Sequence, residues 1–436
     1  MRVDAVGIET YKSLYSLVLR PGNLTVLAGP NNAGKSNLAD ALDFIAEVHR
    51  FGIDLAMRRK GGYENVAHRR VRRSKRPIAF MVRATLSDFE WMDSDSDPRP
   101  SGARVELEHS FSLRAATQAV GADYAIEDEA LTIRSDGRDI VAVRRSKTEL
   151  LLALPQPQSD SAQDLAAAPE DTDYPFQDPS FHQVLKQETE SGNLLLRTLA
   201  FNPVVATFVN QMSRIRVYQL TPLEARRPGV PTPNAELDRH GANLPGLVAS
   251  MRRDDPSAWE AVVQAMRRVL PDLTRIDIAF THDRRLTLNF FERGVGRPWT
   301  VEEVSDGTIQ SLALFAALHD FRTPLLVIEE PENSIHPWIL REFVDVCRSL
   351  SNKQVLITTH SPVLLSYVRP ENVAVMWKEN GISRVADLAE IDPDAVATWE
   401  SGKSTVFELL DSGLIPQSVP AQLPLELTTG ESGPEG

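Results

Sequence analysis

A glycine-rich loop lies between an apolar stretch and a helical pattern near the start of the chain. The apolar stretch reads LTVLA at residues 24–28, and the loop that follows reads GPNNAGKS at residues 29–36. This spacing matches the phosphate-binding loop G-x-x-x-x-G-K-S in its expected context of strand, loop and helix. Glycine permits the backbone torsions that turn successive N–H groups toward a phosphate. The loop therefore predicts an α/β unit that binds a nucleoside triphosphate.

Each position in this P-loop has an expected role toward a bound ATP molecule. We expect Lys35 to reach the β- and γ-phosphates and the Ser36 hydroxyl to coordinate Mg²⁺. The positive end of the dipole of the following helix adds to the attraction for phosphate. The other expected nucleotide contacts are Asn31, Asn32, Ala33, Gly34 and Asn37.

A second Gly-Lys-Ser-Thr sequence occurs in the stretch SGKST at residues 401–405. Ala397 stands where the first glycine of a phosphate-binding loop would be, and no apolar strand precedes the stretch. We therefore predict no phosphate site there.

An apolar strand that ends in two carboxylates is predicted from residue 325. The stretch reads LLVIEEPENSIHP and places Glu329 and Glu330 at the strand end. Phosphate-loop enzymes bring a metal ligand and a water-activating group to the nucleotide in this way. We expect Glu329 to hold Mg²⁺ through a water molecule and Glu330 to act as general base on the attacking water. The alternative is a pair of solvated acids without a catalytic role.

A further apolar strand, VLITTHSP at residues 355–362, ends at His360. An imidazole at this place could donate a hydrogen bond to the γ-phosphate and so sense its presence. A single histidine at a strand end is more often structural. The two motifs already described favour the catalytic role.

The stretch VSDGTIQSLALFAAL at residues 304–318 predicts a buried helix with a capped start. Ser305 and Asp306 are favourable capping residues, and Gly307 permits close approach of another group to the backbone. Alone, this pattern indicates only a well-capped helix. Its place just before the paired carboxylates gives it a second interpretation.

In this order the motifs resemble those of the ATPase heads of the ABC class. Within that class the chain resembles the branch that includes the RecF and structural-maintenance-of-chromosomes (SMC) families and the bacterial OLD-like predicted AAA ATPases. The segments that carry the resemblance are YKSL, GPNNAGKSN, VSDGTIQSLAL, VIEEPENSIHP and TTHSP. The resemblance implies that Ser305 and Gly307 bind the γ-phosphate of a nucleotide held by a second subunit. It also implies a nucleotide contact for Lys12, which could equally be a surface residue.

The chain also departs from these families in three respects. No long coiled coil separates Lys35 from Ser305, unlike in a chromosome-scale clamp. The sequence after His360 contains no acid cluster typical of the Toprim nuclease domain that OLD-like nucleases carry. The glutamine loop of the class has no clear counterpart in the sequence; His68 and Gln118 are candidates, and neither fits well.

The whole chain divides into four predicted regions. Residues 1–150 hold the P-loop and alternating apolar patterns that predict antiparallel strands. Residues 151–290 begin with a stretch rich in Pro, Gln, Asp and Ser at 155–179 and continue with helical patterns, which predicts a flexible segment and a helical insertion. Residues 291–415 hold the later motifs, and residues 416–436 predict a disordered tail.

Strands that alternate with helices predict a parallel core sheet. The expected core strands are 24–28, 325–330, 355–360 and 373–377, and a hairpin is expected at 275–294. The predicted fold class is therefore α/β: an ABC-type P-loop ATPase head with an antiparallel β-layer and an inserted helical subdomain.

Composition limits the partners and the location. The net charge is −13, so the surface as a whole does not resemble that of a general nucleic-acid binder. The stretch from Arg58 to Arg76 is nevertheless dense in cations, and it could bind DNA, dock an acidic protein or remain a solvated loop. The single cysteine, Cys347, fits helix packing in a reducing compartment. With no signal-peptide core and no apolar run long enough to span a bilayer, the sequence predicts a cytoplasmic protein without a membrane span.

The function that these features favour is ATP binding and hydrolysis in a head-to-tail homodimer, with two ATP molecules between the subunits. Analogy with OLD-like ATPases suggests that the ATP state gates or scaffolds a separate effector, such as a toxin or nuclease, in bacterial anti-phage defence. The alternatives are a RecF-like ATPase for DNA repair or DNA loading, and a scaffold that binds ATP without hydrolysing it.

Overall fold

The computed structural model describes residues 1–68, 76–87, 104–115, 123–135, 138–146, 149–153, 183, 187 and 193–412. Four sequence predictions concern residues outside these ranges. They are the flexible segment 155–179, Gln118, the part of the basic stretch at 69–75 and the tail 416–436.

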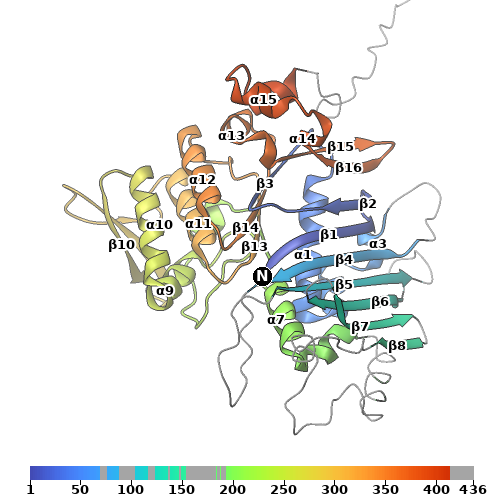
Figure 1. Ribbon diagram of the computed structural model, residues 1–436. Helices are drawn as coiled ribbons and strands as arrows, with labels where there is room; N and C mark the ends of the chain where they lie inside the picture. Colours follow the sequence, from blue (N-terminus) through green and yellow to red (C-terminus); the bar gives the residue numbers. More distant parts are fainter. Residues whose placement is uncertain are drawn as a thin grey trace, which may run out of the picture.

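The described strands include thirteen that form one sheet, in the order β8-β7-β6-β5-β4-β1-β2-β16-β15-β3-β14-β13-β9 (Figure 1). Neighbouring strands at the β9 end are parallel and carry the motifs. They are β15 (Val373–Glu379), β3 (Leu24–Ala28), β14 (Gln354–Thr358), β13 (Leu325–Glu329) and β9 (Arg216–Tyr218). Every residue of β3, β13 and β14 is buried, as in parallel sheets that are covered on both faces. The predicted core strands are confirmed.

The other strands of the sheet form the predicted antiparallel layer. They are β1 (Arg2–Tyr11), β2 (Leu14–Leu19), β4 (Ile78–Leu86), β5 (Val105–Ala115), β6 (Tyr124–Ser135), β7 (Arg138–Ser146), β8 (Glu149–Ala153) and β16 (Ile382–Asp387). Strand β16 is antiparallel to β15 and meets β2 in parallel register at Ser383 and Leu14. The antiparallel layer is therefore hydrogen-bonded into the core sheet, and the fold is mixed α/β.

Helices cover both faces of the core strands. On one face, Leu27 and Leu356 pack into the same core as Leu38 of α1 (Lys35–Phe51). On the other face, Val26 and Ile357 pack with the helices that follow residue 305. These helices are α11 (Asp306–His319), α12 (Pro337–Ser349) and α13 (Pro362–Tyr367). Figure 1 shows α11 and α12 on the opposite side of β3, β14 and β13 from α1.

The described part of region 151–290 is not purely helical. It contains α6 (Leu195–Thr198), η2 (Leu199–Phe201), α7 (Pro203–Met212), α8 (Pro222–Ala225), α9 (Leu244–Asp254) and α10 (Pro256–Val269). It also supplies β9, the edge strand of the core sheet, which is too short to show a sequence pattern. The predicted hairpin is confirmed as β10 (Leu273–Phe280) and β11 (Leu286–Glu292), which form a small sheet with β12 (Trp299–Thr300).

Short helices complete the described chain. They are α2 (Ile53–Arg59), α3 (Tyr63–Val66), η3 (Pro370–Asn372), α14 (Leu388–Ile391), α15 (Ala395–Glu400) and α16 (Val406–Asp411). The stretch 401–405 follows α15 rather than a strand, and Thr405 caps α16 by accepting a hydrogen bond from the Glu408 N–H at 3.2 Å. Cys347 is fully buried in α12, and burial raises the pKa of its thiol. No helix in the described ranges is long and apolar enough to cross a membrane.

Candidate nucleotide site

The P-loop lies between β3 and α1, as predicted, and its two glycines are sterically required. Gly29 has φ 146° and Gly34 has φ 109°, which only glycine adopts readily. A Cβ atom on Gly29 would lie 2.0 Å from the carbonyl oxygen of Met376, and one on Gly34 would lie 2.2 Å from Ser383 Oγ. The backbone of β15 and the Ser383 side chain of β16 therefore lie so close to the loop that neither glycine position has room for a side chain.

Lys35 is enclosed by its own loop. Its Nζ donates to the carbonyl oxygens of Gly29 at 2.7 Å and Pro30 at 3.1 Å, and the residue is 8% exposed. Burial lowers the pKa of Lys35, while the negative charges of Glu330 and Glu332 oppose that shift. The ammonium group thus lies between the loop and the acids that follow β13.

The other predicted residues of the loop have varied surroundings. Asn31, Asn32 and Ser36 are exposed, whereas Ala33 is buried. Asn32 Oδ1 accepts a hydrogen bond from Lys378 at 3.2 Å, and Asn37 Nδ2 donates to Ser13 Oγ at 2.8 Å. The side chains of Asn31, Asn32 and Ser36 are therefore open to a ligand, and their nucleotide contacts stay predictions.

Lys12 lies in a network of charges on α1. Its Nζ donates to Asp40 Oδ2, as does the Tyr11 hydroxyl at 2.7 Å. Lys60 Nζ is 2.8 Å from Asp40 Oδ1 and 2.6 Å from Asp43 Oδ2. Burial alone would raise the pKa of Asp40, but the attraction of Lys60 and the hydrogen bond from Lys12 overcome it and hold this pKa at about 2. The nucleotide contact of Lys12 stays a prediction.

The described part of the basic stretch from Arg58 to Arg76 makes contacts within the chain. Arg59 pairs with Glu47 at 3.1 Å, Lys60 belongs to the network on α1, and the Arg76 guanidinium lies 5.4 Å from the centre of the Tyr15 ring. Arg58 is described as an exposed residue of α2, and the cations outside the described residues are Arg69, Arg70, Arg72, Arg73 and Lys75. DNA binding by this stretch stays a prediction.

The paired acids at the end of β13 point in different directions. Glu329 is 5% exposed, and its Oε1 accepts a hydrogen bond from Arg239 Nη2 at 2.6 Å. Glu330 has φ 46°, and its N–H donates to the carbonyl oxygen of Thr358 at 2.9 Å. The left-handed backbone turns the chain at this point, so that Glu330 Oε1 lies 3.5 Å from His360 Nδ1.

Glu332 joins this group, although the sequence analysis did not select it. Its Oε1 accepts hydrogen bonds from Thr359 Oγ1 at 2.6 Å and from the His360 N–H at 3.3 Å. Its Oε2 is buried and has no hydrogen-bond partner among the described residues. Three acids occur in the sequence EEPE, and the sequence alone does not show which of them face the histidine.

Arg239 and Gln219 are further residues at this edge that the sequence did not reveal. Gln219 follows β9 directly and is exposed beside the carboxyl end of β13. Of the two candidates for the glutamine loop, His68 is buried with its ring nitrogen against the carbonyl oxygen of Lys12, and Gln118 lies outside the described residues. The shortness of β9 explains why no pattern marked Gln219. The signal that could have located Gln219 is its place directly after β9, the strand that pairs with β13.

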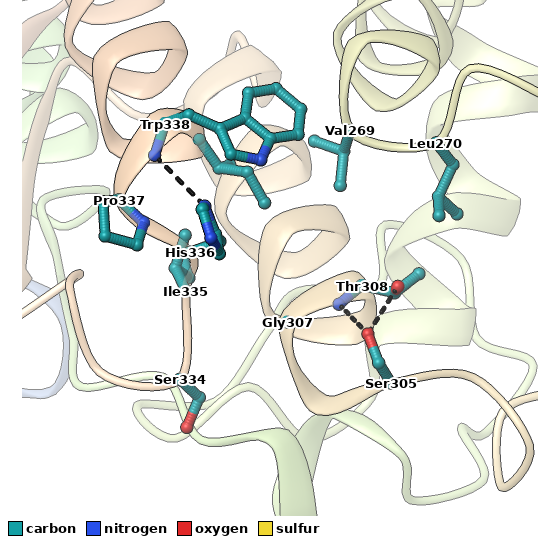
Figure 2. Close-up of a pocket in the computed structure, with 11 residues that line it drawn as sticks. Val269, Leu270, Ser305, Gly307, Thr308, Ser334, Ile335, His336, Pro337 and Trp338 are labelled. Atoms are coloured by element: carbon teal, nitrogen blue, oxygen red, sulfur yellow. Dashed lines mark hydrogen bonds between the residues drawn. The ribbon is translucent and has the colours of Figure 1, made fainter.

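Ser305 and Gly307 lie in a different part of the molecule. Ser305 caps α11, and its Oγ accepts a hydrogen bond from the Thr308 N–H at 3.1 Å (Figure 2). They line an open cavity of about 550 Å³ together with Ser334, His336 and Trp338, which come from the loop after β13 and the start of α12. A Cβ atom on Gly307 would lie 3.1 Å from the carbonyl oxygen of Ser334.

The structure therefore brings one set of predicted residues together and separates another. Strands β3, β14 and β13 are parallel neighbours, so that Lys35, Glu330 and His360 meet at their common carboxyl edge. The cavity around Ser305 belongs to α11, on the face of the sheet opposite to α1. Within one chain, Ser305 and Gly307 therefore do not lie on the same face of the sheet as α1, the helix that follows the P-loop.

The oxygen ligands that Mg²⁺ prefers are present at the predicted metal site. The exposed Ser36 hydroxyl at the start of α1 and the Glu329 carboxylate at the end of β13 are both hard oxygen donors. A metal bound to nucleotide needs only one or two protein ligands of this kind. The donor set fits Mg²⁺, but Arg239 contacts the same carboxylate.

Comparison with solved structures gives three SMC heads among the similar folds, each 11% identical to this chain. The SMC head bound to the C-winged helix domain of ScpA has a TM-score of 0.47, and 88% of this chain and 98% of that one are covered. The head with an extended coiled coil bound to the C-terminal domain of ScpA, from Pyrococcus furiosus, has a TM-score of 0.45, with coverage of 92% and 100%. The head from Thermotoga maritima has a TM-score of 0.38, with coverage of 89% and 99%.

The family comparison is the finding that assigns the chain. No curated protein matches its sequence. Residues 24–366 match a family described as "AAA domain, putative AbiEii toxin, Type IV TA system". The match begins at the strand before the P-loop and extends beyond His360, so it includes the P-loop, the acids after β13 and His360, but not Lys12 in YKSL. The chain therefore belongs to this family of AAA ATPase domains.

Proposed function

We propose that the chain binds ATP at the P-loop and hydrolyses it with Glu330 as the general base. The observation that carries the proposal is the meeting of Lys35, Glu330 and His360 at the edge shared by β3, β14 and β13. A phosphate-binding loop supplies affinity, and a carboxylate beside it supplies the base that hydrolysis needs.

Each side chain has a role that its surroundings favour. Lys35 neutralises phosphate charge, since its ammonium already faces the loop carbonyls that surround it. Glu330 takes the proton of the attacking water, and His360, 3.5 Å from Glu330, donates to the γ-phosphate. Glu332 holds the backbone of His360 in place through the His360 N–H. Mg²⁺ bound by Ser36 and Glu329 would supply further positive charge to the phosphates.

A second copy of the chain completes this site in the proposal. Ser305 and Gly307 lie on the face opposite to α1, so that the residues most suited to a γ-phosphate are not beside the P-loop of the same chain. In a head-to-tail homodimer, Ser305 of one subunit would face the nucleotide on Lys35 of the other. The start of α11 is firmly held for this role, because Arg226 donates to Asp306 at 2.7 Å and to the carbonyl oxygen of Val304 at 2.9 Å.

The proposed purpose of this ATP cycle is control of a separate effector. The family description names a putative toxin of a type IV TA system, which supports a toxin-antitoxin context for this ATP cycle. The separate toxin or nuclease effector and the role in bacterial anti-phage defence come from the resemblance to OLD-like ATPases. The RecF-like alternative gains no support from Arg59, Lys60 and Arg76, because these described cations of the basic stretch contact the chain itself.

Calorimetry with ATP and MgCl₂ tests the first step. Lys35→Ala should weaken ATP binding by about a hundredfold, because a charged hydrogen-bond donor to phosphate is lost. Lys403→Ala, in the stretch SGKST, changes the same residue type outside the site and should leave the affinity unchanged. Equal affinities of folded Lys35→Ala and wild-type protein would refute the assigned site.

A further inference from the structure

We propose that Arg239 is a positioning residue that holds Glu329 in the nucleotide-free protein and has to release it before a divalent cation can bind that carboxylate. This inference rests on the proposed function, because it concerns the predicted metal ligand of the same site. It adds that the Arg239 side chain and an exchangeable divalent cation compete for the Glu329 carboxylate.

The Arg239 guanidinium lies among carboxylates, as a bound metal ion would. Its Nη2 lies 2.6 Å from Glu329 Oε1, and its Nη1 lies 3.5 Å from Asp43 Oδ2 and 4.0 Å from Asp40 Oδ1. The Glu329 side chain is only 4% exposed. A buried carboxylate is costly without a nearby cation, so Arg239 supplies charge that a bound metal would otherwise supply.

The turn that carries Arg239 is held in place by its own hydrogen bonds. The Arg239 carbonyl oxygen accepts from the Gln219 N–H at 2.8 Å, and the His240 carbonyl oxygen accepts from the Thr221 N–H at 3.0 Å. Asp238 Oδ1 accepts from the N–H groups of His240 at 2.9 Å and Ala242 at 2.7 Å. The backbone is thus fixed beside β9, and release of Glu329 requires only rotation of the long Arg239 side chain.

The Arg239 side chain has space for this movement. It is 32% exposed, in contrast to Glu329, and its remaining partners Asp40 and Asp43 lie on α1 rather than on β13. A cation on Glu329 repels a guanidinium at hydrogen-bond distance from the same oxygen. We therefore expect Arg239 to leave Glu329 as metal binds, and to keep the acids of α1 as partners.

Removing Arg239 should change the Mg²⁺ concentration that the protein requires, and the direction of this change depends on whether Arg239 competes with the metal or assists nucleotide binding. If Arg239 competes, its removal lets the metal bind at a lower concentration. If Arg239 instead assists the bound nucleotide, its removal raises the metal requirement or weakens nucleotide binding. The sign of the change therefore tests the inference.

The experiment measures binding of a fluorescent, non-hydrolysable ATP analogue to the full chain as MgCl₂ is titrated. Arg239→Gln should lower the half-saturating Mg²⁺ concentration by about tenfold, the factor that corresponds to an ion pair of ordinary strength. Arg239→Lys keeps the charge with fewer contacts and should lower it by a smaller factor. In a Glu329→Gln background, Arg239→Gln should have no effect, because the shared carboxylate is gone.

Arg50→Gln is the matched control. Arg50 pairs with Glu236 at 2.9 Å. Glu236 is close in sequence to the turn that carries Arg239, but this ion pair does not include Glu329. The Mg²⁺ requirement of this variant should equal that of the wild type. Circular dichroism and thermal unfolding show whether each variant is folded, and Arg239→Lys decides the question if Arg239→Gln does not fold.

The outcomes separate this inference from the proposed function. Wild-type protein that does not bind the analogue at any Mg²⁺ concentration refutes the proposed function, and the inference with it. Wild-type protein that binds in a Mg²⁺-dependent manner, with an unchanged or higher Mg²⁺ requirement in folded Arg239 variants, overturns the inference alone.

Discussion

Removal of the Asp40 carboxylate should weaken the fold around the start of α1 in a way that depends on pH. Asp40 is bonded by Lys12, Lys60 and Tyr11, and its side chain is 13% exposed. Folding lowers its pKa from 3.8 to about 2 despite burial. This change corresponds to roughly 2 kcal/mol of stability at neutral pH.

The sign of the pH dependence follows from the lowered pKa. The unfolded chain binds a proton on Asp40 near pH 4, whereas the folded protein binds it only near pH 2. The stabilisation is therefore complete above about pH 5, and it is lost as the pH falls from about 4 to 2. Asp40→Asn removes it at every pH.

Urea unfolding of wild-type protein and Asp40→Asn at a series of pH values measures this effect. The difference in the free energy of unfolding should be roughly 2 kcal/mol at pH 7 and should decrease steadily below pH 4. Asp345→Asn is the control, because Asp345 forms an exposed pair with Arg348 on α12 and should contribute less than about 1 kcal/mol. A difference at pH 7 no larger than that of the control, or one that grows toward low pH, would refute the reasoning.

Three further predictions concern the site and its support. Glu330→Gln should still bind ATP but should hydrolyse it about a hundred- to ten-thousand-fold more slowly in a phosphate-release assay, and an unchanged rate would remove Glu330 as the base. Mixing Lys35→Ala subunits with Ser305→Arg subunits should restore some hydrolysis, since each mixed dimer can hold one intact site. If subunit exchange is proven and no hydrolysis returns, the result counts against a shared site, unless both sites must act together. Lys353→Met should lower the free energy of unfolding by about 3 kcal/mol in urea titrations, because the buried Lys353 Nζ donates to three carbonyl oxygens at the end of α11, at 2.6, 2.7 and 3.1 Å; a change no larger than that of a surface substitution would contradict this cap.

The elements that could be predicted were those with a strong local pattern. The P-loop, β3 and the start of α1 were located within a residue, because the glycines, the apolar run and the lysine act over a few neighbouring positions. The hairpin β10–β11 and the buried helix α11 were found for the same reason. The alternation of apolar residues within residues 1–150 also predicted the antiparallel layer, to which β4 and β5 belong.

Long-range geometry decided the rest. Strand β9 has three residues and becomes part of the core sheet only by pairing with β13. Lys12 matched a motif in sequence, but its position is determined by Asp40 on another element. Glu332 resembled its neighbours chemically and was distinguished only by its contacts with Thr359 and His360.

The sequence by itself determined that this chain has a P-loop, two strand-end acids and a mixed α/β fold, because each of these depends on the order of residues within one strand or turn. Only the tertiary structure decided which charges meet. Arg239 and Glu329 are 90 positions apart, and no spacing rule connects them. Their contact depends on how one turn lies against the end of β13, which in turn depends on the packing of the sheet and its helices. The same packing placed Ser305 on the face opposite to α1, away from the P-loop whose nucleotide it is predicted to bind.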